Sequence, residues 1–323
     1  MVATTTTDGS MTPAIMGEQL LQNPLYVWMP PTLAAMFFWG LGQGLVKKYI
    51  EDVSPAKFCL YYIIARSIVM GCFYLYSLAK GEVPPLFIPE ARGFIIYGLV
   101  TYLLDGIAWI LYYESIISGP ITIVGTLSAA YPALTVVMAR IFLNEQVTTY
   151  QLIGVIMVIV SCIGLSVPHK EAITEKVKHG RWIPLAVSAL LVWGISATIS
   201  KYAYLQAGSD EANMCLLSIT GGMLTLGLYG ILRGKKEVKD LSIALTPGQW
   251  KRAAVPMAVM GTGDLGVLIA TKTGPISIVT PISASYPVVT LGFAWLALKE
   301  RITGLQWIFV VTIIIGVFLT SVI

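Results

Sequence analysis

The sequence predicts an all-α integral membrane protein of about ten transmembrane helices, built as two inverted five-helix repeats around a central cavity. Three observations lead to this prediction. Hydrophobic residues make up 56% of the 323 residues and charged residues only 12%, whereas a soluble domain carries about 25% charged residues. Ten apolar segments approach the roughly 20 residues that cross a bilayer. A stretch of the first half recurs in the second half.

The ten segments follow one another with short polar connections, and Gly-Pro breaks at 118–120 and 273–275 separate two of the pairs. We expect them at 27–46, 58–79, 93–115, 121–143, 149–167, 182–205, 213–232, 253–272, 277–298 and 304–323. Residues 1–26 contain no Lys or Arg and therefore lack the basic region of a signal peptide. We expect a disordered polar tail at 1–26, a first repeat at 27–167, a linker at 168–181 and a second repeat at 182–323.

The internal repeat is explicit in the sequence. GPITIVGTLSAAYPALT at 119–135 matches GPISIVTPISASYPVVT at 274–290 in 10 of 17 positions, an offset of 155. Trp39-Gly40 recurs as Trp193-Gly194, and Lys47 recurs as Lys201. Because each half holds an odd number of helices, the second half enters the membrane from the opposite side. Inverted repeats are typical of secondary transporters, which bind substrate near the midplane between the halves.

Each half resembles an EamA-type repeat of the drug/metabolite transporter superfamily. The matching residues are Trp39-Gly40 and Trp193-Gly194, Tyr131-Pro132 and Tyr286-Pro287, Leu143 to Glu145 and Leu298 to Glu300, and Arg66. The resemblance implies ten helices, a central cavity and transport of metabolites such as amino acids, nucleotide sugars, sugar phosphates or organic cations. The second half departs from the pattern, since it has no basic residue from Cys215 to Leu232.

Charged side chains inside the apolar segments are the first candidates for the transport site. A charge at the bilayer centre costs at least about 2.5–3.5 kcal/mol, so it must face a cavity or a partner. Asp105 lies 14 residues before Gly119 and Asp264 lies 10 before Gly274, a difference close to one helical turn. The two carboxylates could form a cation or proton site, or could each pair with a lysine or a helix end. Arg66 could hold a substrate carboxylate or phosphate, or could pair with Asp105.

Aromatic side chains accompany these charges, and in other segments Ser128 shares a face with Tyr131 around Pro132, as Ser283 does with Tyr286 around Pro287. Trp109 lies four residues after Asp105, and Tyr112 or Tyr113 continues that face. Aromatic rings could form a cavity wall for an organic cation, or could serve as packing and interface anchors. The candidate residues for substrate binding or coupling are Trp39, Arg66, Asp105, Trp109, Ser128, Tyr131, Trp193, Lys201, Asp264, Ser283 and Tyr286.

The sequence gives little support for an enzyme, a metal-binding protein or a nucleic-acid-binding protein. His169 and His179 lie in the linker, the four cysteines lie in apolar segments without metal-ligand spacing, and there is no P-loop. We therefore expect no catalytic residues, no metal, no cofactor and no enzyme activity. The basic residues lie in connecting segments, so we expect no nucleic-acid partner.

The function expected from the sequence is secondary transport of a small metabolite, amino-acid-like or an organic cation, most simply by export. Proton or cation coupling would fit the two carboxylates. Alternatives are a sugar-phosphate or nucleotide-sugar exchanger and, more remotely, an intramembrane lipid-modifying enzyme or a passive channel. The partners are a small molecule and the lipid bilayer, and the chain could be a monomer or a homodimer.

Two arguments about orientation disagree. The connections after the first, fifth, seventh and ninth segments hold 15 of the 21 basic residues, and basic loops stay in the cytoplasm. This count places both termini outside a membrane of the bacterial inner (plasma) type, whereas the family resemblance implies cytoplasmic termini. The 15 residues are Lys47, Lys48, Lys57, Lys170, Lys176, Lys178, Arg181, Arg233, Lys235, Lys236, Lys239, Lys251, Arg252, Lys299 and Arg301.

Overall fold

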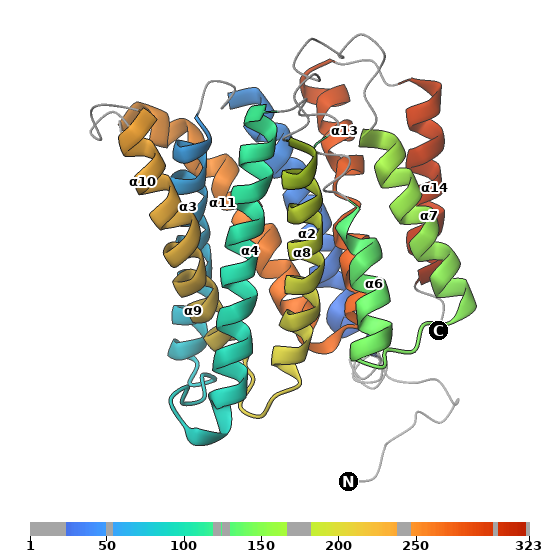
Figure 1. Cartoon of the computed structure of the whole chain (residues 1–323). Coiled ribbons are helices and arrows are strands. Elements are labelled where there is room, and N and C mark those ends of the chain that lie inside the picture. Colours follow the sequence, from blue (N-terminus) through green and yellow to red (C-terminus); the bar gives the residue numbers. More distant parts are fainter. Residues whose placement is uncertain are drawn as a thin grey trace, which may run out of the picture.

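A computed structural model of the chain describes residues 24–49, 54–118, 124, 130–166, 182–237, 247–299 and 303–320. Every regular element among these residues is a helix, as the sequence predicts. The helices stand side by side in one bundle and run roughly parallel to a common axis (Figure 1).

Among the described residues, the first half contributes five long or medium helices and one short 3₁₀ turn. Helix α3 begins where the hydroxyl of Ser54 accepts a hydrogen bond from the backbone N–H of Lys57, with Pro55 in the first turn. Helix α6 also has a proline, Pro132, in its first turn, where no N–H is needed. The elements are α2 (Pro24–Tyr49), α3 (Pro55–Ala79), η1 (Pro89–Ala91), α4 (Arg92–Ser118), α6 (Tyr131–Phe142) and α7 (Thr149–Ser166).

Among the described residues the second half has the same order of longer helices, with one further short helix, Ile276–Ser283, before the last two. Asp210 caps the helix that corresponds to α3, because its carboxylate accepts a hydrogen bond from the backbone N–H of Asn213. That helix passes through a π-helical turn, η4, which separates α9 from α10. The elements are α8 (Trp182–Tyr204), α9 (Glu211–Gly222), η4 (Met223–Gly227), α10 (Leu228–Glu237), α11 (Pro247–Thr273), α12 (Ile276–Ser283), α13 (Pro287–Ala297) and α14 (Gly304–Thr320).

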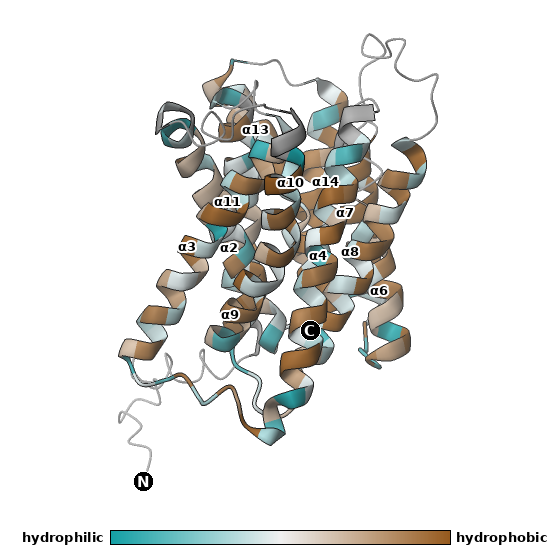
Figure 2. Ribbon diagram, turned by 60° about the vertical axis from the view of Figure 1, so that its left-hand side comes forward, coloured by the Kyte–Doolittle hydropathy of each residue, from teal (hydrophilic) through white to brown (hydrophobic). Residues whose placement is uncertain are grey.

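The outer surface of the bundle is apolar. Six helical segments of the described chain are long and apolar enough to cross a membrane, and three shorter apolar helices accompany them, namely Tyr131–Phe142, Thr149–Gly164 and Gly304–Thr320. Hydrophobic residues dominate the ribbons over the middle of the bundle (Figure 2). Many large apolar side chains on this surface are exposed, such as Phe318 on α14, which a bilayer would cover. The total of ten transmembrane helices stays a prediction.

Helices of the first half pack against helices of the second half. α2 packs along α11, α4 packs along α8, and α7 packs along α14. The last pair approaches closely at Gly154 and Gly316, since a Cβ on Gly316 would lie 2.8 Å from the carbonyl oxygen of Gly154. Close approach of this kind requires small residues, as is common between helices in membranes.

Helices α2 and α8, which correspond to each other in the repeat, run in opposite directions. The end of α11 is in contact with Lys201 near the end of α8 and with Trp28 near the start of α2. The start of α2 and the end of α8 therefore lie at the same end of the bundle, although Trp39 and Trp193 are equivalent in the repeat. This is the relation that inverted repeats require.

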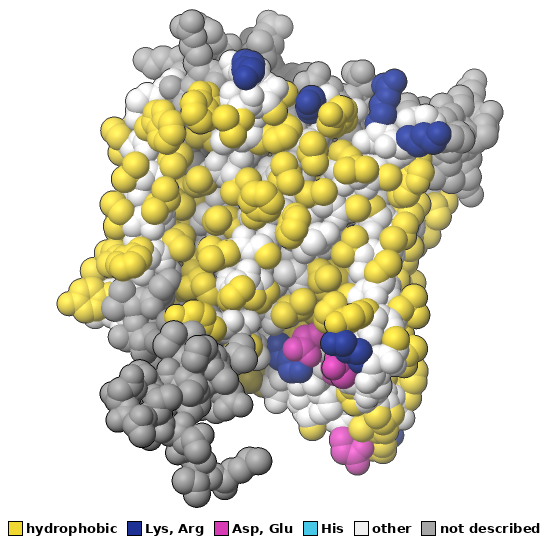
Figure 3. Space-filling view, turned by 180° about the vertical axis from the view of Figure 1, so that it is seen from behind, with side chains coloured by type: hydrophobic (Ala, Val, Ile, Leu, Met, Phe, Trp, Pro, Cys, Tyr) yellow, Lys and Arg dark blue, Asp and Glu magenta, His cyan; other side chains and the backbone are white. Residues whose placement is uncertain are grey.

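Charged side chains gather at the two ends of the bundle. In Figure 3 a row of lysine and arginine side chains lines the upper edge, a mixed group of both signs lies near the lower end, and an apolar belt separates them. The exposed described basic residues in the last turn of α2, just after α13 and in the first turns of α11 are Lys48, Lys299, Lys251 and Arg252. At the opposite end Lys272 on α11 pairs with Glu211 on α9.

Candidate functional site

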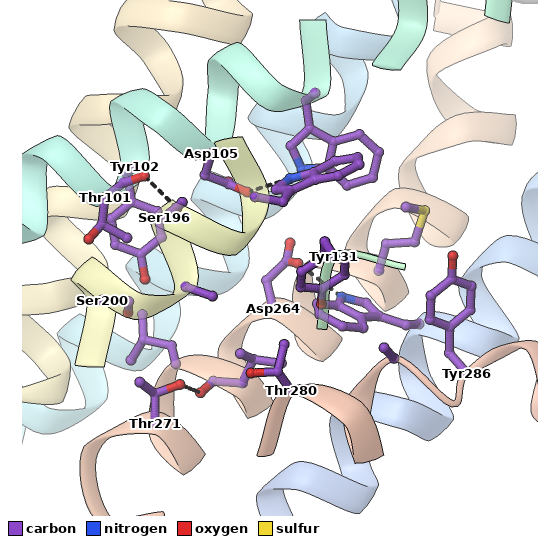
Figure 4. Close-up of a pocket in the computed structure, with 18 of the residues that line it drawn as sticks. Thr101, Tyr102, Asp105, Tyr131, Ser196, Ser200, Asp264, Thr271, Thr280 and Tyr286 are labelled. Atoms are coloured by element: carbon purple, nitrogen blue, oxygen red, sulfur yellow. Dashed lines mark hydrogen bonds between the residues drawn. The ribbon is translucent and has the colours of Figure 1, made fainter. Parts of the chain in front are cut away.

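A cavity of about 170 Å³ lies in the middle of the bundle. One wall comes from α2, α3 and α11, and the facing wall comes from α4 and α8, with α6, α12 and the following turn closing the remaining sides. Figure 4 shows Asp105 and Asp264 on these two walls, with Tyr131 and Tyr286 nearby. The lining residues are Trp39, Gln43, Arg66, Thr101, Tyr102, Asp105, Trp109, Tyr112, Tyr131, Trp193, Ser196, Ala197, Ser200, Met260, Asp264, Val267, Leu268, Thr271, Ile276, Thr280, Ala284 and Tyr286.

Asp264 belongs to the first wall and is bound by side chains of that same wall. Its Oδ1 accepts a hydrogen bond from the indole N–H of Trp39 at 2.9 Å, and its Oδ2 accepts one from the hydroxyl of Tyr62 at 2.5 Å. Gly263 permits this arrangement, because a Cβ there would lie 2.3 Å from the ring of Trp39. The carboxylate is therefore oriented by donors from α2 and α3 before any ligand arrives.

Asp105 is held in a similar way on the second wall. The indole N–H of Trp193 on α8 donates to its Oδ1 at 3.2 Å. Trp193 is the repeat equivalent of Trp39, so each half supplies one tryptophan to the carboxylate of the other half. The Asp105 side chain is 20% exposed and that of Asp264 is 10% exposed, so Asp105 is the more accessible carboxylate.

Arg66 of α3 connects the two walls. Its Nη1 lies 2.8 Å from Oδ2 of Asp105, and its Nε lies 3.5 Å from Oδ2 of Asp264. The side chain is only 4% exposed, and its guanidinium lies over the rings of Tyr62 and Tyr102 at 5.9 and 5.3 Å. Nε finds no hydrogen-bond partner among the described residues. The arginine thus hydrogen-bonds one carboxylate and has an unused donor, Nε, 3.5 Å from the other.

Aromatic rings surround these charges. Trp193 packs against Trp109 and Tyr112 with ring centroids 5.2 and 5.5 Å apart, and it lies 6.0 Å from Tyr131. Trp39 lies edge-on to Tyr286 at 6.1 Å. The faces of such rings attract cations. Seven aromatic residues line the cavity in all: Trp39, Tyr102, Trp109, Tyr112, Tyr131, Trp193 and Tyr286.

Hydroxyl groups line the end of the cavity near the close of α8 and α11. Ser196 donates to the backbone carbonyl of Thr101 at 2.9 Å, and Thr271 donates to that of Val267 at 2.7 Å. Ser200 and Thr280 lie in the same region of Figure 4. The cavity is therefore aromatic around the carboxylates and hydroxyl-lined toward this end.

The junction of α11 and α12 at this end is fixed by two charged side chains. Lys201 donates to the carbonyl oxygens of Thr271, Lys272 and Gly274 at 3.0, 3.1 and 2.9 Å. Glu145 accepts hydrogen bonds from the first backbone N–H groups of α12, at Ile276 and Ser277, at 2.9 and 3.0 Å. A cation at a helix C-terminus and an anion at a helix N-terminus are both favourable. These residues satisfy backbone groups where the chain passes from α11 to α12.

Eight of the eleven sequence candidates line the cavity: Trp39, Arg66, Asp105, Trp109, Tyr131, Trp193, Asp264 and Tyr286. Ser128 lies outside the described residues. Ser283 is fully buried outside the lining and donates to the carbonyl of Thr280. Lys201 binds the end of α11. Of the alternatives for Arg66, the structure contains the ion pair with Asp105.

The structure adds residues that the sequence reasoning did not select. Tyr62 is the most important, because it hydrogen-bonds Asp264. Its spacing of four residues before Arg66 places it on the same helix face, which is a signal that the sequence does contain. Gln43, Ser196 and Ser200 also line the cavity, but small polar side chains in apolar helices carry no comparable signal.

Comparison with known proteins agrees with this arrangement. A crystal structure of another protein aligns with a TM-score of 0.71 over 90% of this chain and 95% of that chain, at 14% identity, and so shares the fold. An uncharacterised protein of Methanocaldococcus jannaschii is 34% identical over 73 residues, which are 23% of this chain and 53% of that relative. The chain thus spans about half the length of this curated relative.

The family comparison covers nearly the whole chain. Residues 26–167 and 180–322 each match the model of the EamA-like transporter family, so both halves of the sequence repeat carry the match. The family is one of multi-pass membrane transporters, which agrees with the apolar helices of the bundle. The chain belongs to the EamA-like transporter family, within the drug/metabolite transporter superfamily.

Proposed function

We propose that the protein is a secondary transporter that carries a small positively charged or amino-acid-like metabolite through the cavity between its two repeats. The observation that carries this proposal is the charge of the cavity. Two carboxyl groups, those of Asp105 and Asp264, face one guanidinium, that of Arg66, and these are the acidic and basic side chains among the described lining residues. With both carboxylates ionised, one negative charge is left over.

An uncompensated charge inside a membrane protein is costly, so a positive ligand is favoured there. A monovalent organic cation, the ammonium group of an amino acid, or a proton would each supply the missing charge. The aromatic side chains support the first two, because cation–π contacts add to the attraction of the carboxylate. The indole groups of Trp39 and Trp193 donate hydrogen bonds to the carboxylates, and both residues line the cavity.

A sugar phosphate or nucleotide sugar is the less favoured cargo. A phosphate would enter a cavity with two carboxylates, and its natural partner Arg66 is already 2.8 Å from Asp105. Like charges in a site of low dielectric repel strongly. The described lining residues offer no second lysine or arginine to offset this repulsion.

Alternating access through ten helices in a five-plus-five arrangement is part of the same proposal. The opposite directions of α2 and α8 and the burial of the carboxylates between the repeats support it. The distribution of basic residues supports an orientation with both termini outside the cytoplasm. Labelling of a single cysteine at position 10 with an impermeant maleimide tests it, because a cysteine in the cytoplasm would react only after lysis.

A ligand screen on the purified protein in detergent is the direct test of the cargo class. The melting temperature would be measured with organic monocations, zwitterionic amino acids and sugar phosphates, since a ligand that binds the folded state raises it. We expect stabilisation by at least one cation or amino acid. The variant Asp105→Asn should lose this shift, and Glu114→Gln, on the same helix but outside the cavity lining, should keep it. Stabilisation by sugar phosphates alone would contradict the proposed cargo.

A further inference from the structure

The two carboxylates of the cavity are not equivalent, although the repeat relates their helices. Position 264 corresponds to Trp109 at the offset of 155, and position 105 corresponds to Met260. In the first half the aspartate comes four residues before the bulky Trp109, whereas in the second half the bulky Met260 comes four residues before the aspartate. The two carboxylates are therefore offset by about one helical turn. Asp264 accepts hydrogen bonds from Trp39 and Tyr62 on its own wall, whereas Asp105 accepts one from Trp193 on its own wall and one from Arg66 across the cavity.

Arg66 has no counterpart in the second repeat. The equivalent positions in α9 are Thr220 and Gly221, and a Cβ on Gly221 would already lie 2.7 Å from the Cβ of Tyr102. An arginine there has no room. The described lining residues therefore include a single guanidinium, and it comes from the wall that α2, α3 and α11 form.

The ion pair of Arg66 with Asp105 crosses the cavity, because α3 packs mainly on α9 and α11, whereas Asp105 lies on α4. The alternative partner, Asp264, is on the arginine's own side at 3.5 Å from Nε. That Nε is buried and has no hydrogen-bond partner among the described residues. A buried donor without a partner is costly. A short movement of the guanidinium toward Asp264 would give this Nε–H an acceptor.

We propose that Arg66 is a movable counter-ion that closes the cavity. In the closed arrangement it binds Asp105 across the cavity. When a positively charged cargo pairs with Asp105, the guanidinium moves to Asp264 and the two walls are released from each other. Asp105 is then the carboxylate that takes the charge of the cargo, and Asp264 is the one that holds Arg66 meanwhile. This inference rests on the proposed function for the nature of the cargo, but the movement of Arg66 can be tested without any cargo.

The test is the maleimide labelling rate of one cavity cysteine. Ser200→Cys, on the hydroxyl-lined side of the cavity, serves as reporter after Cys59, Cys72, Cys162 and Cys215 have been replaced by alanine. Asp105→Asn removes the cross-cavity pair and should raise the labelling rate. Asp264→Asn removes the alternative partner and should lower it. We expect the two variants to differ by about tenfold or more, the size of one charge-assisted hydrogen bond. Glu114→Gln, on the same helix as Asp105, should leave the rate unchanged.

Arg66→Gln provides an independent variant in case an asparagine variant does not purify as a monodisperse protein. This substitution removes the ion pair by changing the arginine, so the cysteine reporter at position 200 should be labelled as fast as in Asp105→Asn. Equal rates in the two asparagine variants, faster labelling of Asp264→Asn than of Asp105→Asn, or a wild-type rate in Arg66→Gln would each overturn the inference. Since these measurements need no cargo, a failure here leaves the result of the ligand screen intact, and a failed screen leaves the labelling result intact.

Discussion

The ion pair between Arg66 and Asp105 should dominate the stability of the cavity. Removing one partner of a buried pair typically costs about 3–5 kcal/mol, because the other charge is left unpaired. Arg66→Met leaves two carboxylates facing each other, so we expect the destabilisation by this substitution to lie in this range. Asp105→Asn should cost less, because Asp264 lies 3.5 Å from Arg66 and can take over the guanidinium.

A double-mutant cycle separates the pair from the other effects of each substitution. Equilibrium unfolding in mixed detergent would be measured for the wild type, Arg66→Met, Asp105→Asn and the double variant. At 2.8 Å and with Arg66 only 4% exposed, the interaction energy should be about 1–3 kcal/mol. The double variant should therefore be more stable than the sum of the single effects predicts.

A matched cycle comes from the pair of Arg233 and Glu114, whose atoms are 3.8 Å apart and whose side chains are 39% and 32% exposed. Solvent and long side chains weaken such a pair, so its interaction energy should stay below about 1 kcal/mol. Additive effects of Arg66→Met and Asp105→Asn, within about 0.5 kcal/mol, would refute the reasoning, because two side chains bound across a cavity cannot act independently.

Two further predictions concern packing and helix ends, and thermal denaturation in detergent checks both. Gly316→Ala should destabilise the protein by about 1–3 kcal/mol, because its Cβ would lie 2.8 Å from the rigid backbone oxygen of Gly154. The control Gly292→Ala, whose Cβ would have nothing within 4 Å, should be neutral or slightly stabilising. Equal effects of the two substitutions would contradict the close packing. Lys201→Met should lower the stability by about 2 kcal/mol or more, because three carbonyl oxygens lose their donor. The control Lys80→Met, at an exposed lysine, should change the stability by less than about 0.5 kcal/mol. A similar loss of stability in both variants would contradict the role assigned to Lys201.

Much of the fold and part of the site could be predicted from the sequence. The high cost of charge in lipid selects Asp105, Asp264 and Arg66 without any structural information. The repeat selects Trp39 and Trp193, because the same dipeptide recurs at a fixed offset. These residues reach the cavity because the helices of one half pack against those of the other, which the repeat alone does not state.

The remaining features depend on distant contacts. Tyr61 and Tyr62 are adjacent in an apolar stretch, yet Tyr61 packs on Trp250 and Tyr62 binds Asp264. Hydrophobic periodicity does not distinguish them, because every face of such a helix is apolar. The partner of Lys201 was equally hidden, since it is a set of backbone carbonyls at the end of another helix.

Exchange transport in proteoliposomes tests the central claim most directly. The cation or amino acid found in the ligand screen would be loaded inside, and uptake of the labelled compound would be followed for the wild type, Asp105→Asn, Asp264→Asn and the control Glu114→Gln. We predict saturable uptake that the internal substrate stimulates, at similar rates in the wild type and the control, and a reduction of about tenfold or more in both aspartate variants. Wild-type exchange by both aspartate variants would contradict a transport site built on the two carboxylates of the cavity.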